Sequence, residues 1–480
     1  MARSGPDRHA GLVLYGIMAA FLLGVGALGQ LGAGTAARLL FITGSVAIAW
    51  HAYRRGGLAS HVEMVIPLFV LGPLLRRIID LHSAYDPTGV MLIGPLLALV
   101  VVLPELRTLL SARSRPLADF LPLILIIGCV GYGWAISSFQ NNVVESSAVA
   151  VKYVIPVLYC MVLMVRSDQS DNVLAAAARA FLLLGPVIGI YGIAQHLAPQ
   201  AWDQFWMVAS KIPSIGQPFP GQVRVFGTMN SPVSFAAYAT FGLLLFGFMP
   251  RSFVPPILVP LVAILPLGIA ILLTSVRTAW ISASVSLLFC LLFRRTRGRA
   301  TLMIVCLSFA AVFAVSFTSF GDVIASRFAT LDGNVAGDGS GSERLGDYFH
   351  VFSEDSRYIF GTGLAPVDGD TKLSALDGQI LMAGVQMGTV FGVLYVVGMV
   401  WAGVRAVLQV RGSADPLRLV AAALVVGNLA VIPLTAVGIG EIGFLFWMAV
   451  GALSSARNAV PATRARRVRP LRPPLLFPTR

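Results

Sequence analysis

The most constraining feature of this chain is a series of apolar runs that recur along its whole length. Many of them reach about 18 or more residues, which matches the roughly 20-residue helix that a bilayer core requires. Hydrophobic residues make up 57% of the 480 residues, and charged residues only 12%. A transmembrane barrel would instead show segments of about 10 alternating residues. The sequence therefore predicts an all-α, polytopic integral membrane bundle whose single domain covers residues 1–480.

We place about fourteen membrane-spanning helices on these runs. Their expected ranges are 11–30, 36–53, 62–75, 88–104, 119–138, 148–165, 175–195, 231–249, 253–273, 278–293, 301–319, 379–403, 417–436 and 441–455. The first run has no clear small-residue cleavage site, so we interpret it as a retained span and not as a signal peptide. The third run is short and contains Pro67, Gly72 and Pro73, so a re-entrant or interfacial segment is an alternative there.

Basic residues are distributed unevenly between the two sides of the predicted bundle. With the N-terminus in the cytoplasm, 24 of the 35 Lys and Arg residues fall inside, whereas 15 of the 22 acidic residues fall outside. The positive-inside rule thus predicts that both termini are cytoplasmic. The net charge of +13 then reflects topology, and we expect no nucleic acid as a partner. The basic tail, residues 456–480, is expected to be disordered and to contact membrane lipid.

The longest polar insertion is the segment 320–378, which this topology places outside the membrane. A polar loop of this size between spans is usually either functional or disordered. Residues 344–363 have the pattern of a helix followed by a glycine turn, so we expect a folded, helical loop. Charged residues in the middle of spans are nearly absent, while polar groups gather at this outer side. The working surface of the protein is therefore expected here.

Two arginines on the outer side depart from the charge bias and are candidates for anion binding. Arg224 precedes a span together with Asn230, and Arg277 lies in a tight turn between two spans. A guanidinium group is planar and permanently charged, and it can bind phosphate oxygens in a bidentate manner. The two groups are therefore expected to converge on one lipid-linked diphosphate. The alternative is that each arginine reaches toward lipid headgroups without further function.

The order of these motifs resembles the O-antigen ligase and polymerase superfamily of bacterial envelopes. The first motif runs from Arg224 to Tyr238 and includes Gly227, Asn230 and Pro232, similar to an Arg-x-x-Gly-x-x-x-Asn-Pro entry to a span. The second is Thr274-Ser275-Val276-Arg277, similar to a Thr-x-Ser-Arg turn with one residue inserted or shifted. The third begins at Arg344, continues through residues 358–364 and ends at Asp377-Gly378-Gln379, before a glycine-rich span. The resemblance covers residues 200–405.

One position departs from the family pattern. Ligases of this family carry a catalytic histidine just before the span that follows the large loop, where this chain has Asp377 and Gly378. His350 is the only histidine of the loop, and a surface role suits it. The resemblance therefore implies a polymerase of lipid-linked repeat units. Asp377 can act as a general base on the acceptor hydroxyl, or it can simply cap the helix that follows.

The resemblance implies a metal-independent glycosyltransferase of the bacterial inner membrane that makes exopolysaccharide or O-antigen. Arg224 and Arg277 would stabilise the leaving diphosphate, with Arg344 and Asn230 as further substrate-binding residues. No metal and no cofactor is expected. The expected partners are a polyprenyl-diphosphate-linked oligosaccharide, membrane lipid and other polysaccharide export components. The alternatives are an O-antigen ligase that transfers glycan to another acceptor, and a transporter or flippase of lipid-linked sugars.

Overall fold

The computed structural model describes residues 5–110, 116–140, 142–248, 258–317, 321, 346, 348, 357–365, 378–411, 413 and 415–454. Within these ranges the regular structure is helical, and the pairing of Gly216 with Val223 is an isolated bridge. The helices are α1 (Gly5–Gln30), α2 (Gly34–His82), α3 (Ile93–Val100), α4 (Leu121–Phe139), α5 (Val143–Val165), α6 (Ser170–Leu197), α7 (Ala201–Ser210), α8 (Pro232–Phe248), α9 (Leu258–Leu273), α10 (Arg277–Leu291), α11 (Arg294–Phe317), α14 (Arg357–Phe360), α15 (Gln379–Leu408), α16 (Pro416–Ala430) and α17 (Gly440–Ser454). Short 3-10 turns lie at Val90–Leu92, Leu103–Leu110, Leu117–Asp119, Ser167–Gln169 and Pro213–Ile215.

The helices have the lengths and compositions of a membrane protein. Seven helical stretches in the described part of the chain are long and apolar enough to cross a bilayer. Five further apolar helices have 10–17 residues, which is shorter than the roughly 20 residues of an untilted span. The prediction of an all-α membrane protein is confirmed in this coarse form. The number of crossings and their orientation stay predictions, because length and composition alone do not show which short helices cross.

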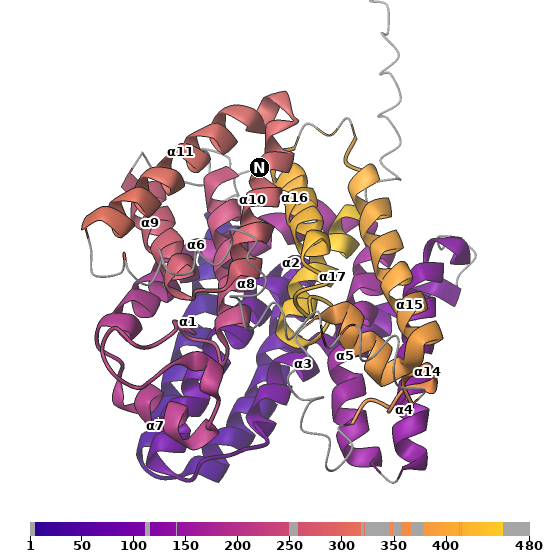
Figure 1. The fold of residues 1–480 in the computed structure, drawn as a ribbon, viewed down its shortest axis with the longest axis horizontal. Helices are drawn as coiled ribbons and strands as arrows, with labels where there is room; N and C mark the ends of the chain where they lie inside the picture. Colours follow the sequence, from indigo (N-terminus) through magenta and orange to yellow (C-terminus); the bar gives the residue numbers. More distant parts are fainter. Residues whose placement is uncertain are drawn as a thin grey trace, which may run out of the picture.

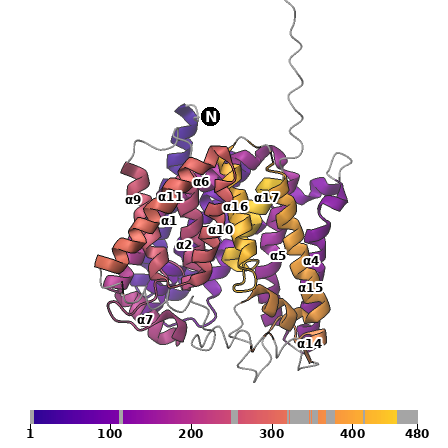
Figure 2. The same ribbon diagram turned by 45° about the horizontal axis from the view of Figure 1, so that its top comes forward.

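The helices form one bundle in which α16 and α17 lie between two groups (Figure 1). One group contains α1, α2, α6, α9 and α11, and the other contains α4, α5, α14 and α15. Contacts join α17 to α5 in one group and to α6 in the other, so the central pair connects both groups. Figure 2 shows α7 and α14 at one end of the bundle, whereas α1 begins at the opposite end. We call the end with α7 and α14 the loop end.

Helix α2 contains two of the predicted spans and a break between them. Gly56 and Gly57 leave the helical region, and Gly57 has a φ of 64°, which favours glycine because no Cβ is present. The second half of α2 is helical through Pro67 and Pro73, and both prolines are buried. Neighbouring helices can satisfy the backbone groups that such prolines free. The region for which a re-entrant segment was an alternative is thus part of a long, buried helix.

Part of the large polar loop is folded against the bundle. Residues 357–365 begin with α14 and then run beside α15, where the amides of Thr362 and Gly363 donate to the carbonyls of Val385 (2.8 Å) and Gln386 (3.0 Å). The α15 backbone opens for this contact at Gly388, whose φ is 77°. These residues thus contain a short helix that contacts α15, whereas a folded, helical loop over 320–378 stays a prediction. The expected helix at 344–353 lies outside the described residues, apart from isolated positions.

Gly388→Ala tests whether this contact holds the loop segment. A Cβ at Gly388 would lie 2.6 Å from the Ile359 carbonyl oxygen, at a φ that an L-residue rarely adopts. We expect the variant to lose about 1–3 kcal/mol of stability, measured by thermal unfolding in detergent, with faster proteolysis of the loop. Gly128→Ala on α4 is the matched control, because a Cβ there meets nothing within 4 Å. Equal melting temperatures for the two variants would contradict the assignment.

Candidate functional site

The turn between α9 and α10 carries Arg277 at the loop end. Ser275 has a φ of 53°, an unusual conformation for a residue with a side chain. The Thr274 hydroxyl accepts from the Val276 amide at 3.2 Å and donates to the Ile271 carbonyl at 2.6 Å, so the turn closes on itself. Arg277 then begins α10 in a half-buried position. This tight geometry fixes where the Arg277 backbone enters the helix.

Arg224 lies directly on this turn. Its Nε donates to the Thr274 carbonyl at 3.3 Å, and its Nη2 donates to the Ser275 carbonyl at 3.4 Å. Its Nη1 donates to the carbonyl of Ser214 at 2.8 Å. The structure thus brings together the two segments that carry Arg224 and Arg277, which are 53 positions apart in the sequence. With these three bonds, the side chain of Arg224 positions the turn that carries Arg277.

A buried guanidinium group shapes the segment that follows Arg224. Arg77 of α2 is fully buried and donates to the carbonyls of Gly227 (2.6 Å) and Met229 (3.0 Å). Its Nε lies 3.4 Å from the Oδ1 of Asp203 on α7, which is also fully buried. Its guanidinium carbon lies 4.7 Å from the centre of the Phe226 ring. An ion pair and a cation–π contact therefore hold the loop between α7 and α8 onto α2.

Helix α6 completes this network from the other side. The Gln195 side chain accepts from the amides of Phe226 (3.0 Å) and Gly227 (2.8 Å) and donates to Asp203 Oδ2 at 2.9 Å. Tyr191 donates to the same carboxylate oxygen at 2.8 Å. Sequence reasoning missed Arg77, Gln195 and Asp203. The available indication was their polar character next to apolar runs, but their mutual contact depends on three separate helices.

Asn230 lies at the end of this segment, and its side-chain amide is buried. Both its amide nitrogen and its amide oxygen are buried, and neither has a hydrogen-bond partner in the described part of the chain. The hydroxyl of Thr228, which is 1% exposed, is likewise without a partner there. Buried polar groups without partners are costly and need an explanation. A polar ligand at the mouth of α8 would supply the missing hydrogen bonds.

Glu441, in the first turn of α17, contacts the first turns of α8. One of its carboxylate oxygens accepts from the Ser234 hydroxyl at 2.7 Å, and its backbone carbonyl accepts from the Tyr238 hydroxyl at 3.1 Å. Both donors lie on α8, and Ser234 is bonded to Ser231 just after Asn230. Sequence reasoning also missed Glu441. It is an isolated carboxylate in the first turn of a short apolar helix, a pattern that could have singled it out.

An apolar groove starts at Arg277 and runs along α10. It has a volume of about 550 Å³ between α9, α10 and α11, and most of the side chains that line it are apolar. Its lining includes Ile271 and Leu272 of α9, and Ile304 and Leu307 of α11. Among the described residues of the lining, Arg277 is the ionisable one. The groove therefore offers a hydrophobic channel with a guanidinium group at the loop end.

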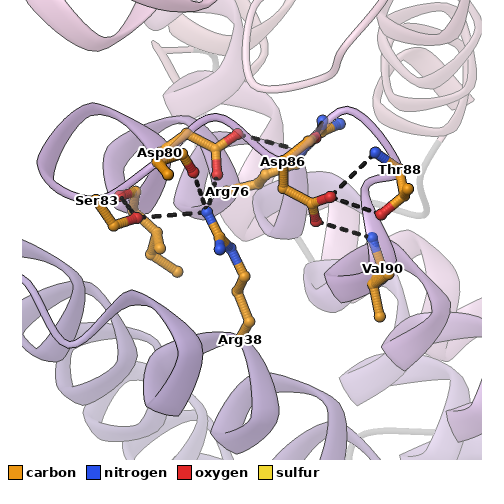
Figure 3. A network of polar contacts seen from close by, with 9 residues as sticks. Arg38, Arg76, Asp80, Ser83, Asp86, Thr88 and Val90 are labelled. Atoms are coloured by element: carbon orange, nitrogen blue, oxygen red, sulfur yellow. Dashed lines mark hydrogen bonds and ion pairs between the residues drawn. The ribbon is translucent and has the colours of Figure 1, made fainter.

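A second polar network stiffens the loop end beside α2 (Figure 3). Arg38 forms an ion pair with Asp80 at 2.7 Å, and Asp80 also lies 3.5 Å from Arg76. Asp86 accepts from the amide and hydroxyl of Thr88 and closes the following turn. Burial alone would raise the pKa of Asp86, but the Thr88 bonds and the charge of Arg76 lower it below its ordinary value. These contacts join Arg38, in the first half of α2, to the end of the same helix and to the residue Ala84 that follows it.

Other predicted site residues have different outcomes. Asp377, Arg344 and His350 lie outside the described residues. Within the described ranges, no group of three or more His, Cys, Asp or Glu residues has metal-binding geometry. Glu63 and Arg179 form an ion pair of 2.9 Å inside the bundle, and Tyr15 donates to Glu63, so this charge inside the bundle is neutralised by its partner.

A scan against protein-family models and a search of curated proteins found no match to this chain.

Arg77→Ala tests the importance of the buried ion pair. Removing the guanidinium leaves the Asp203 carboxylate buried and unpaired, which typically costs about 3–5 kcal/mol. We expect a strongly lowered melting temperature in detergent. We also expect faster hydrogen exchange in the segment before α8, because that segment loses its contacts with α2. Arg54→Ala is the control, since Arg54 is exposed. If the two variants have equal melting temperatures, Arg77 does not hold the loop between α7 and α8.

Proposed function

We propose that this chain is a membrane glycosyltransferase that polymerises polyprenyl-diphosphate-linked oligosaccharide units for an exopolysaccharide or O-antigen. The observation that carries the proposal is the apolar groove that ends at Arg277. An amphiphile with a long apolar chain and an anionic head matches this combination of surfaces. The motif order between residues 200 and 405, which resembles the O-antigen ligase and polymerase superfamily, supports the same substrate class.

The groove suits the isoprenoid part of such a donor. Its lining on α10 extends from Arg277 to Leu288, which corresponds to roughly 16 Å along the helix axis. Ile281 and Leu288 in this lining are substantially exposed, so apolar surface is open for contact with a lipid chain. A polyprenyl chain in the groove would exchange contacts with lipid tails for contacts with these side chains, so van der Waals packing would select it.

The polar head would lie at the mouth formed by α8 and α10. Arg277 would bind the diphosphate, and Arg224 would hold the turn that presents it. The unpartnered amide of Asn230 would donate to a phosphate or sugar oxygen. When the bond between the sugar and the phosphate breaks, negative charge grows on the leaving diphosphate. A fixed guanidinium stabilises that charge without further reorganisation.

We further propose that the protein is a multi-pass protein of the bacterial inner membrane with both termini in the cytoplasm. The bias of basic residues toward one side of the predicted spans supports this orientation. The loop end, where α7 and α14 lie, would then face outward, on the side that we propose for polymerisation. Other polysaccharide export components would meet the product there.

A donor-binding assay tests this proposal. The purified protein in nanodiscs is titrated with a polyprenyl-diphosphate-linked oligosaccharide, and polymer is followed by gel electrophoresis. Arg277→Lys keeps the charge but loses the planar fork, so we expect donor affinity to fall about tenfold, equivalent to about 1.4 kcal/mol. Arg411→Lys, on an exposed residue away from the groove, is the matched control.

A variant that obstructs the groove provides a second test of donor binding. Ala283 lines the groove, and Ala283→Trp would fill part of it. We expect strongly reduced binding of the lipid-linked donor, whereas Val393→Trp on the exposed face of α15 should bind normally. Transfer of glycan to a separate acceptor without chain growth would favour a ligase. Absence of any donor binding by the unmodified protein would overturn the proposal.

A further inference from the structure

We infer that a small cavity between α8, α10, α16 and the start of α17 binds ordered water that joins these four helices. The cavity measures about 30 Å³, and all four helices contribute to its lining. One water molecule needs about 10–15 Å³ of such space, so the cavity is large enough. The inference does not depend on the proposed function, because it rests on polar groups and packing inside the bundle.

The hydroxyl of Thr240 on α8 is the first of these polar groups. Thr240 lines the cavity and is 3% exposed, and its hydroxyl has no hydrogen-bond partner in the part of the chain that the structure describes. By contrast, the buried hydroxyls of Ser45 and Ser286 donate to the carbonyls of Phe41 (2.6 Å) and Ser282 (2.7 Å), each four residues earlier. This bond within the helix is the usual solution for a helical hydroxyl. Thr240 does not use it, and a buried hydroxyl without a partner is costly.

Polar side chains from the neighbouring elements complete the lining. They are Thr278 and Ser282 of α10, Asn428 of α16 and Thr435 of the segment between α16 and α17, and all four are buried. The Asn428 Nδ2 donates to the Leu424 carbonyl at 2.8 Å, so its Oδ1 remains as an acceptor toward a ligand. A buried water typically makes about three hydrogen bonds. Hydroxyl groups that both donate and accept, together with an amide oxygen, supply enough partners for it.

The composition of the lining favours a neutral ligand over an ion. Among its described residues, none carries a charge, and apolar side chains such as Ala237 and Phe241 form much of the wall. An ion without compensating charge is very unfavourable in such surroundings, whereas water is neutral. Thr278 and Ser282 face this cavity, while Arg277 and Ile281 line the apolar groove. The bound water would therefore hold α10 from the side away from the groove.

Thr240→Val tests the inference through the sign of its effect. Valine keeps the shape of the side chain and removes the hydroxyl. If the hydroxyl binds water, the variant loses hydrogen bonds, and we expect the melting temperature in detergent to fall by at least about 1 °C. If the hydroxyl is unpaired, the same change removes a costly polar group and raises the melting temperature. An unchanged or raised melting temperature would overturn the inference.

Thr43→Val is the matched control for this measurement. Thr43 lies on an exposed face of α2 outside the cavity, and its hydroxyl donates to the Leu39 carbonyl of its own helix at 2.9 Å. The control measures what the exchange of threonine for valine does to a helix by itself. We expect the melting temperature of Thr240→Val to lie below that of Thr43→Val.

A direct measurement needs no variant. In a cryo-EM map of the unmodified protein in nanodiscs that resolves ordered water, we expect a peak in the cavity about 2.5–3.0 Å from the Thr240 Oγ1. A map with ordered water elsewhere in the bundle and no peak in this cavity would contradict the inference. Melting temperatures in equal concentrations of sodium, potassium and choline chloride should agree. A rise with sodium alone would identify a bound cation and would also overturn the assignment to water.

Discussion

The candidate site depends on one buried charge. The Arg77 guanidinium lies inside the protein, where an uncompensated charge would be very unfavourable. Asp203, the carbonyls of Gly227 and Met229, and the face of the Phe226 ring together compensate it. All of these groups except Asp203 belong to the segment that leads into α8. Burial of the charge therefore forces that segment onto α2, which fixes the backbone on which Arg224 and Asn230 stand.

The position of this segment also fixes the turn before α10 and the start of α8. Arg224 binds the backbone of the Thr274–Ser275 turn, so the position of the turn follows from the position of the loop. The turn begins α10, whose other face lines the apolar groove. Helix α8 meanwhile holds Glu441 through Ser234 and Tyr238. In the described part of the chain, Arg277 thus lies at the end of a hydrophobic groove.

The sequence predicted different parts of this arrangement to different degrees. The lengths of the apolar runs were sufficient to predict apolar helices, because hydrophobicity over about 20 residues is a property of local composition. The pattern also singled out Arg224 and Arg277, because isolated cations beside apolar runs are conspicuous. It did not identify Arg77 or Asp203, because their ion pair joins two helices that are far apart in the sequence. Nor did it identify Glu441, because nothing in its neighbourhood in the sequence shows that α8 lies beside α17.

The sequence by itself determined the class of protein, the helices and the clustering of polar residues between particular spans. These properties follow from interactions between a residue and its near neighbours or the solvent. Only the tertiary structure decided which helices meet, and therefore which polar groups are paired and which are not. Asp203 is neutralised by Arg77 from α2, whereas in the described part of the chain Glu441 accepts from a serine of α8 and has no cationic partner. The difference between a carboxylate with a cationic partner and one without arises from packing, because a charge partner can come from any distance along the chain.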